Sequence, residues 1–281
     1  MQNKNVVITG GNAGIGLATS MALAKQGANI FLVSRNKDKA ADAAEAIKQA
    51  TGNGNVQYLI ADLSVQHSIR ELDKELRNRL ASIDVLINNA GGVFPQFSKS
   101  ADGLEMTIAT NHFSYFLLTN LLLDLVQQSP WGRIVNVASR AHVNASIDIE
   151  SFTQDKGYFI FKAYGQSKLA NVLFTAELAR RLGNSHVTVN SLHPGLVKTD
   201  IGNKKTNWYS TLAWTLYSRI GGLSIEDGAA TSIYLASSKD VAGITGKYFA
   251  KCKATTPSAL AQDVALQKEL WRISEQYCPL V

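Results

Sequence analysis

Short apolar segments recur along the chain and alternate with longer segments in which apolar and polar residues are mixed. The short segments are rich in Val, Ile and Leu and are nearly continuous in apolar residues. That pattern is typical of strands that are buried on both faces of a parallel sheet. It predicts about seven strands, at 5–9, 29–34, 56–60, 84–88, 133–139, 187–192 and 247–250.

The segments between these strands carry apolar residues at helical spacing. They predict helices over 14–26, 38–50, 65–81, 102–128 and 160–183, with a last helix near 258–275. Alternating strands and helices predict an α/β fold of the Rossmann type, a doubly wound parallel sheet with right-handed crossovers and helices on both faces. The longest apolar stretch, 113–126, is too short to cross a bilayer, so we expect a buried helix there.

The composition is that of an ordinary globular protein. Of the 281 residues, 46% are hydrophobic and 18% are charged, which excludes a disordered chain. No Pro- or Ser-rich linker divides the sequence, so we expect residues 1–281 to form a single domain. The net charge of +6 is spread along the chain without a block of like charges, which argues against a nucleic-acid partner.

The cysteines and the first residues bear on the cellular compartment. Cys252 and Cys278 form no CxxC motif, so we expect neither a disulfide framework nor a metal site, and a reducing compartment fits. We expect Cys278, near the C-terminus, to be exposed. The first residues show no charged segment followed by an apolar one, so we expect no secretory signal and a cytoplasmic protein.

A glycine-rich segment, VVITGGNAGIG (6–16), joins the first predicted strand to the first predicted helix. Glycine permits a tight turn and a close approach of the backbone to a ligand, and a helix N-terminus attracts phosphate. Such a loop can also be only a tight turn, but its place between strand and helix favours a dinucleotide site. The predicted contact residues are Gly10, Asn12, Ala13, Gly14, Ile15 and Gly16.

The end of the second predicted strand indicates which dinucleotide binds. An NAD site has an acidic residue there for the ribose 2′-hydroxyl, whereas this chain has Ser34 and Arg35. The guanidinium of an arginine pairs with phosphate through two hydrogen bonds. We therefore expect NADP(H), the alternative being that Arg35 is an ordinary surface arginine.

Candidate catalytic residues lie further along the chain. YGQSK (164–168) places Tyr164 and Lys168 on one helix face, where an ammonium would lower the pKa of the phenol toward neutral pH. Ser139 ends a predicted strand at the carboxyl edge of the sheet, where ligands bind, and its hydroxyl can hold a substrate oxygen or merely cap the strand. Asn111, in the expected helix 102–128, would by itself be a surface or capping residue.

Taken together, TGGNAGIG (9–16), NNAG (88–91), Asn111, Ser139, YxxxK (164–168) and PG (194–195) occur in the order of the short-chain dehydrogenase/reductase family. The chain resembles that family over essentially its whole length, which implies an NAD(P)-binding enzyme acting on CH–OH groups. The resemblance implies that Tyr164 is the general acid/base, that Ser139 orients the substrate oxygen and that Lys168 holds the nicotinamide ribose and tunes Tyr164. It implies that Asn111 anchors a water in the proton relay.

The same resemblance assigns further residues to the cofactor. Asp62 would contact the adenine, Asn89 would lie along the cofactor, and Val197 and Thr199 would lie near the carboxamide. Their neighbours complete the predicted cofactor set: Leu63, Ala90, Gly91, Pro194 and Gly195.

Several segments resemble more narrowly the retinol dehydrogenase branch of that family. They are 167–182, 191–201, 246–253 and 270–276. The branch prefers NADP(H), has arginine at the position of Arg35, and acts on retinoids and on other apolar aldehydes and ketones. Many of its animal members carry an N-terminal hydrophobic anchor, which this sequence does not show. Reduction is the direction we expect where NADPH is abundant.

Residues 200–225 follow the sixth predicted strand and contain a group of aromatic residues. In the family this segment covers the substrate, so the aromatics predict an apolar small-molecule substrate, with core packing as the alternative. Lys204 and Lys205 beside them would also suit contact with a membrane surface. The aromatic residues are Trp208, Tyr209, Trp214 and Tyr217.

Other functions receive less support from the sequence. A non-catalytic NADP(H)-sensing protein on the same fold would tend to lose the catalytic Tyr or Lys, and both are present here. A serine hydrolase is disfavoured because no GxSxG motif occurs. None of the five histidines lies at metal-ligand spacing, and we interpret His112 and His193 as structural. The resemblance also implies homo-oligomers, which in this family form through two long helices.

Overall fold

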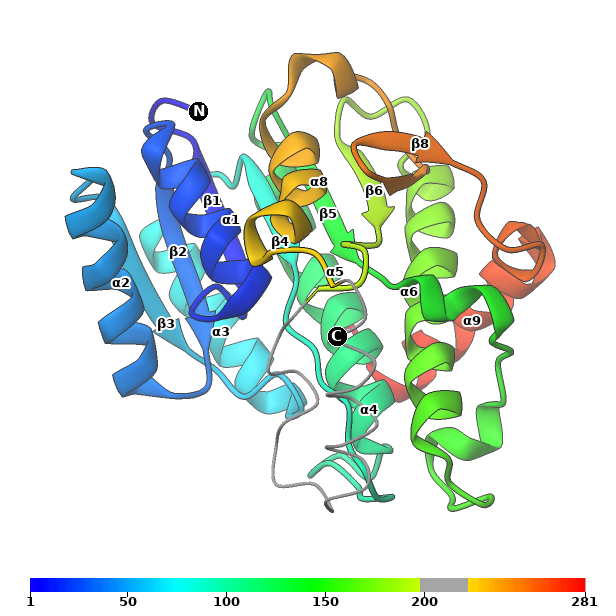
Figure 1. The fold of residues 1–281 in the computed structure, drawn as a ribbon. Helices are drawn as coiled ribbons and strands as arrows, with labels where there is room; N and C mark the ends of the chain where they lie inside the picture. The colour runs from blue at the N-terminus through cyan, green and yellow to red at the C-terminus, as the bar shows by residue number, and fades with distance from the viewer. Residues whose placement is uncertain (198–221, 281) are drawn as a thin grey trace.

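Alternating strands and helices build an eight-stranded sheet with helices on both faces in the computed structural model, which describes residues 1–197 and 222–280 (Figure 1). The strand order is β3-β2-β1-β4-β5-β6-β7-β8, and neighbouring strands are parallel except for β8, which runs antiparallel to β7. The strands are β1 Asn5–Thr9, β2 Asn29–Ser34, β3 Val56–Ile60, β4 Val85–Asn88, β5 Arg133–Val137, β6 Thr188–Leu192, β7 Tyr248–Ala250 and β8 Lys253–Thr255. The predicted Rossmann-type sheet is confirmed, with one short edge strand added.

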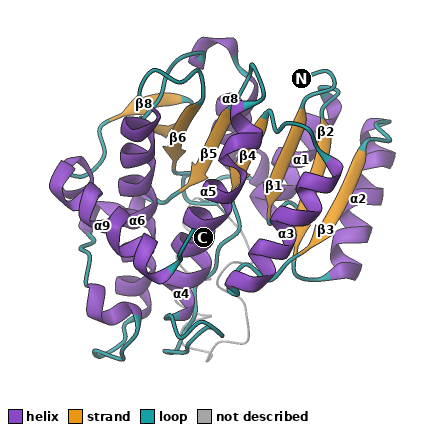
Figure 2. Ribbon diagram, turned by 180° about the vertical axis from the view of Figure 1, so that it is seen from behind, coloured by secondary structure: helices purple, strands orange, loops and turns teal. Residues whose placement is uncertain are grey.

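The helices form two layers because alternate residues of each strand face opposite ways. Val6 and Ile8 pack against the layer of α1, α2 and α8, whereas Val7 packs against the layer of α3, α5 and α6. Figure 2 shows the second layer, with α9 lying outside α5 and α6. The helices are α1 Gly14–Lys25, α2 Lys37–Thr51, α3 Gln66–Arg79, α5 Ser114–Gln127, α6 Ile160–Leu182, α8 Ile225–Ser237 and α9 Val264–Tyr277.

The expected helix over 102–128 starts later than predicted and is interrupted. It begins as a short helix, α4 (Met106–Ile108), in which the Glu105 carboxylate accepts hydrogen bonds from the N–H groups of Thr107 and Ile108. A π-helical turn, η1 (Ala109–Phe113), then precedes α5. Such turns insert an extra residue into a helix and are frequent at functional sites. The turn contains Asn111.

The C-terminal segment also differs from the prediction. The last helix, α9, begins only at Val264, where the Asp263 carboxylate accepts hydrogen bonds from the N–H groups of Ala265 and Leu266. Cys278, at the end of this helix, is fully buried, so the expectation of an exposed thiol was wrong. Burial raises the pKa of the Cys278 thiol to about 12. The segment packs its aromatic side chains against α5 and α6, which explains why its end is covered.

Two further findings concern the described residues only. None of their helices combines the length and the apolar composition needed to cross a membrane. No group of three or more His, Cys, Asp or Glu side chains among them is placed to hold a metal ion. Residues 200–221 of the predicted substrate-covering segment lie outside the described residues, and so do its four aromatics and Lys204 and Lys205.

Candidate active site

The glycine loop leaves β1 and enters α1 along a path that side chains would block. Gly10 and Gly14 have φ angles of +64° and +51°, which glycine adopts without strain. A Cβ on Gly16 would lie 2.2 Å from the carbonyl oxygen of Gly10, so only glycine allows this approach. Helix α1 starts after Ala13, whose side chain provides no cap. Its first N–H groups therefore suit an anion such as a pyrophosphate.

The loop after β4 lies against the glycine loop. The hydroxyl oxygen of Thr9 accepts hydrogen bonds from the N–H groups of Asn89 at 2.8 Å and Ala90 at 3.0 Å. The side-chain amide of Asn89 donates to the Thr9 carbonyl at 2.8 Å. The predicted residues of these two loops are thereby brought together. Thr9 was missed as a candidate, although its place directly before the glycines was a usable signal.

Residues at the ends of β2 and β3 form the outer part of the predicted cofactor site. Arg35 is exposed directly after β2, and the buried Ser34 hydroxyl accepts a hydrogen bond from the N–H of Asn36. Asp62 is exposed, and its carboxylate accepts hydrogen bonds from the N–H and hydroxyl of Ser64. The side chain of Leu63 packs in the core, which leaves its backbone as the part that can meet a ligand.

Asn111 is fully buried, which contradicts its interpretation as a surface residue. Its side-chain oxygen accepts from the N–H of Gly92 at 2.8 Å, and its side-chain amide donates to the Gly92 carbonyl at 3.0 Å and to the Ser167 hydroxyl at 2.9 Å. The side-chain amide of Asn171 donates to the backbone carbonyl of Asn111 at 2.9 Å. Asn111 thus joins the π-helical turn to the loop after β4 and to α6. No local sequence pattern pointed to Gly92, Ser167 or Asn171.

Ser139, Tyr164 and Lys168 come together where β5 ends beside α6. Ser139 is half-buried two residues beyond β5, and its hydroxyl oxygen accepts a hydrogen bond from the N–H of Ala141 at 3.2 Å. The ammonium of Lys168 is buried, donates to the carbonyl of Val137 at 3.0 Å and lies 5.7 Å from the centre of the Tyr164 ring. The three side chains therefore occupy the carboxyl edge of the sheet, next to Gly91 and Asn111.

Burial dominates the proton affinities in this cluster. It lowers the pKa of Lys168 from 10.5 to about 7, because a buried ammonium loses hydration. Burial also raises the pKa of Tyr164, and a hydrogen bond with the Ser139 side chain acts in the opposite direction. The expectation of a lowered Tyr164 pKa was wrong for the protein by itself, because the cost of burying the phenolate outweighs the stabilising contacts.

The segment after β6 completes the carboxyl edge. Gly195 has a φ angle of +86°, and its N–H donates to the side chain of His193 at 3.1 Å. Pro194 precedes it, and Val197 forms a parallel bridge with Leu223. The structure therefore places the predicted segment directly after β6. Thr199 lies outside the described residues.

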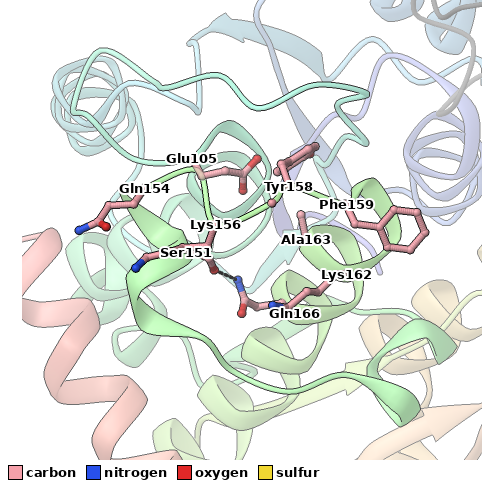
Figure 3. Close-up of a pocket in the computed structure, with 10 residues that line it drawn as sticks. Glu105, Ser151, Gln154, Lys156, Tyr158, Phe159, Lys162, Ala163 and Gln166 are labelled. Atoms are coloured by element: carbon pink, nitrogen blue, oxygen red, sulfur yellow. Dashed lines mark hydrogen bonds between the residues drawn. The ribbon is translucent and has the colours of Figure 1, made fainter.

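A second pocket lies on another face of α6 and is a different feature (Figure 3). Its lining includes Glu105, Tyr158, Phe159 and Gln166, with Gln166 donating a hydrogen bond to the hydroxyl of Ser151. None of the four predicted catalytic side chains lines it. Residues three or four apart share a helix face, so Phe159, Ala163 and Gln166 point away from the face of Tyr164 and Lys168. The pocket is not part of the catalytic cluster.

Comparisons with known proteins agree with this geometry. Residues 4–210 match the family described as short chain dehydrogenase. Retinol dehydrogenase 14 of Mus musculus is 40% identical over 288 aligned residues, which cover 98% of this chain and 86% of that protein.

Solved structures are similar over most of the chain. A protein of uncharacterised function from Mycobacterium paratuberculosis has a TM-score of 0.77 and 31% identity, covering 99% of this chain and 94% of that one. The Pseudomonas aeruginosa RhlG/NADP active-site complex has a TM-score of 0.70 and 27% identity, covering 89% of this chain and 94% of that one.

Proposed function

The chain belongs to the short-chain dehydrogenase/reductase family, and from this premise we propose that it is an NADP(H)-dependent carbonyl reductase for apolar aldehydes and ketones. It is an oxidoreductase that uses a nicotinamide cofactor, acts on CH–OH groups and is related to the retinol dehydrogenases. The observation that carries the proposal is the cluster of Ser139, Tyr164 and buried Lys168 at the carboxyl edge of the sheet. Ligands bind at this edge in open α/β sheets.

The residues of the glycine loop fit a dinucleotide. The space that a Cβ on Gly16 would fill and the uncapped start of α1 favour a pyrophosphate at that point. Lys168 and Asn89 would lie along the nicotinamide half. When bound, the reduced nicotinamide supplies a hydride to the substrate carbonyl carbon.

The protein supplies the proton and the orientation. Ser139 donates a hydrogen bond to the substrate oxygen, and the Tyr164 hydroxyl gives its proton to that oxygen as negative charge develops there. The resulting phenolate is stabilised by the ammonium of Lys168, which is 5.7 Å from the ring centre. Alcohol oxidation uses the same groups in reverse, with Tyr164 accepting the proton.

The preference for NADP(H) rests on the end of β2. Arg35 is exposed there and carries a charge that suits the 2′-phosphate of NADP(H), whereas an acidic residue would suit the free 2′-hydroxyl of NAD(H). The NADP complex of the similar Pseudomonas aeruginosa protein also supports this choice.

The substrate class rests on the relative. The similar mouse protein is named for retinol, an extended apolar alcohol, so we propose an apolar alcohol and its carbonyl compound as the substrate pair here. Reduction is the favoured direction, because cells keep NADPH abundant.

A carbonyl panel tests the proposal. The purified protein is mixed with NADPH, or with NADH in parallel, and with aldehydes and ketones of increasing apolar length, retinal included. Absorbance of the reduced nicotinamide is followed, and NADPH binding is measured separately by fluorescence. We expect NADPH consumption that increases with the apolar character of the substrate. Tight NADPH binding without turnover on any compound would instead favour the sensing protein, and a preference for NADH would overturn the role of Arg35.

A further inference from the structure

His142 lies three residues after Ser139, in the short helix η2 (Arg140–Asn144), and is fully buried. Its ring nitrogen Nδ1 is 2.8 Å from the carbonyl oxygen of Ser139. A carbonyl oxygen only accepts hydrogen bonds, so Nδ1 carries a proton and donates it. The backbone N–H of His142 donates to the same oxygen at 3.2 Å. The residue therefore holds the Ser139 carbonyl with two hydrogen bonds.

The other ring nitrogen of His142 is held from the C-terminal segment. The backbone N–H of Ser258 donates to Nε2 at 3.2 Å, so Nε2 carries a lone pair. The two contacts select one neutral tautomer, and burial lowers the pKa of His142. The ring also packs edge-on against Tyr248, with the ring centres 4.7 Å apart. Its orientation is thus determined on every side by the segments after β6 and β7.

We propose that His142 is a positioning residue for the reaction: it holds Ser139 at the substrate oxygen and transmits the support of the C-terminal segment around Ser258. This inference rests on the proposed function, because it assigns to Ser139 the substrate oxygen. His142 itself touches neither substrate nor cofactor in this account.

The packing between η2 and α6 explains why a small displacement of Ser139 matters. Gly165, beside Tyr164, is so close to η2 that a Cβ there would lie 3.1 Å from the carbonyl oxygen of Ala141. Ser139 and Tyr164 are thus set by the same tight contact between η2 and α6. Misplacing a catalytic group by about 1 Å can cost on the order of a hundredfold in rate.

The two amide isosteres of histidine separate the two ring contacts. Asparagine places its amide N–H groups near the position of Nδ1, whereas the longer glutamine places them near Nε2. His142→Asn therefore keeps a donor for the Ser139 carbonyl, and His142→Gln removes it. His186→Asn is a control, because the Nε2 of His186 contacts the carbonyl of Ser129 at 2.8 Å, before β5 and β6 begin.

The experiment measures kcat, KM, NADPH affinity and thermal unfolding for the three variants and the wild type. We expect His142→Gln to lose roughly tenfold to a hundredfold in kcat, with NADPH affinity unchanged. His142→Asn should stay within about threefold of the wild-type kcat, and His186→Asn should match the wild type, whatever its unfolding temperature. Equal losses in both His142 variants, or a loss of unfolding temperature alone, would overturn the proposal.

Two readouts separate a positioning role from general damage. The pH profile of alcohol oxidation by His142→Gln should move to higher pH, because the contact with Ser139 lowers the pKa of Tyr164. An unshifted profile would contradict the proposal. If the wild type turned over no carbonyl, the proposed function would fail by itself. The carbonyl-carbon NMR resonance of Ser139 would then decide: a shift in His142→Gln but not in His142→Asn supports the inference, and equal shifts refute it.

Discussion

The glycine loop and the catalytic cluster meet at one edge of the sheet, but they are built in different ways. The glycine loop, with Gly10 and Gly16, is shaped by the backbone and presents N–H groups at the start of α1. The catalytic cluster is built from buried polar side chains of separate elements, such as Asn111 and Lys168. The difference teaches that a substitution in the loop should change cofactor affinity, whereas one in the cluster should change turnover.

The largest expected effect is that of Tyr164→Phe. Removing the hydroxyl removes the proton donor, so we expect kcat to fall about 10²- to 10⁴-fold. NADPH affinity, measured by fluorescence titration, should stay near the wild-type value because the aromatic ring remains. An equal loss in affinity and turnover would mean that the two parts of the site are not separable in the way we describe.

Gly16→Ala tests the opposite half of the comparison. Its Cβ would lie 2.2 Å from the carbonyl oxygen of Gly10, so the loop must shift. We expect NADPH affinity to fall by at least about tenfold, since the N–H groups at the start of α1 lose their alignment. Gly54→Ala is the matched control, because nothing lies within 4 Å of its added Cβ. Wild-type affinity in Gly16→Ala, measured by the same titration, would contradict the proposed cradle.

Arg35→Ala sharpens the comparison within the cofactor half. Hydrogen bonds to charged groups contribute about 1.5–3 kcal/mol, so we expect the KM for NADPH to rise roughly tenfold to a hundredfold. The KM for NADH should change little, because NADH lacks the 2′-phosphate. Arg79→Ala, at the far end of α3, provides a surface control. A parallel rise for both cofactors would show that Arg35 does not select the phosphate.

The smallest effect on turnover at neutral pH is expected for His112, next to Asn111. Burial lowers its pKa from 6.5 to about 4. Between these values the unfolded chain binds a proton that the folded protein does not, so stability is lost as the pH falls from 6.5 toward 4. The loss should reach about 3 kcal/mol in the free energy of unfolding.

His112→Gln is the comparison for that prediction. Glutamine does not titrate and can still reach the Ser274 hydroxyl, which lies 3.0 Å from Nε2 of His112. Urea unfolding at several pH values should give a shallower acid-side slope for the variant. The same slope in both proteins would show that His112 is not the titrating group.

Much of the loop half was predictable from the sequence because its signals are local. The strands, the glycines and Arg35 are adjacent along the chain, and the observed strand ends lie within two residues of the predicted ones. Strands that are buried on both faces leave a clear apolar pattern.

The cluster half was less predictable because long-range contacts determine it. The interruption of the helix at 102–128 depends on the hydrogen bonds of Asn111 with Gly92 and Ser167 and on the bond from the N–H of Glu105 to the carbonyl of Phe152. Likewise, the contact between His142 and Ser258 joins residues that are far apart in the chain. Motif order identified Ser139, Tyr164 and Lys168 as candidates, but not the residues that hold them.

The most direct test of the central claim follows the hydride itself. NADPH carrying deuterium at the transferable position of the nicotinamide is incubated with the protein and an apolar aldehyde, and the alcohol is analysed by mass spectrometry, with Tyr164→Phe alongside. We predict one deuterium on the carbinol carbon with the wild type and almost no product with the variant. Alcohol formed without deuterium, or formed equally well by Tyr164→Phe, would contradict the account.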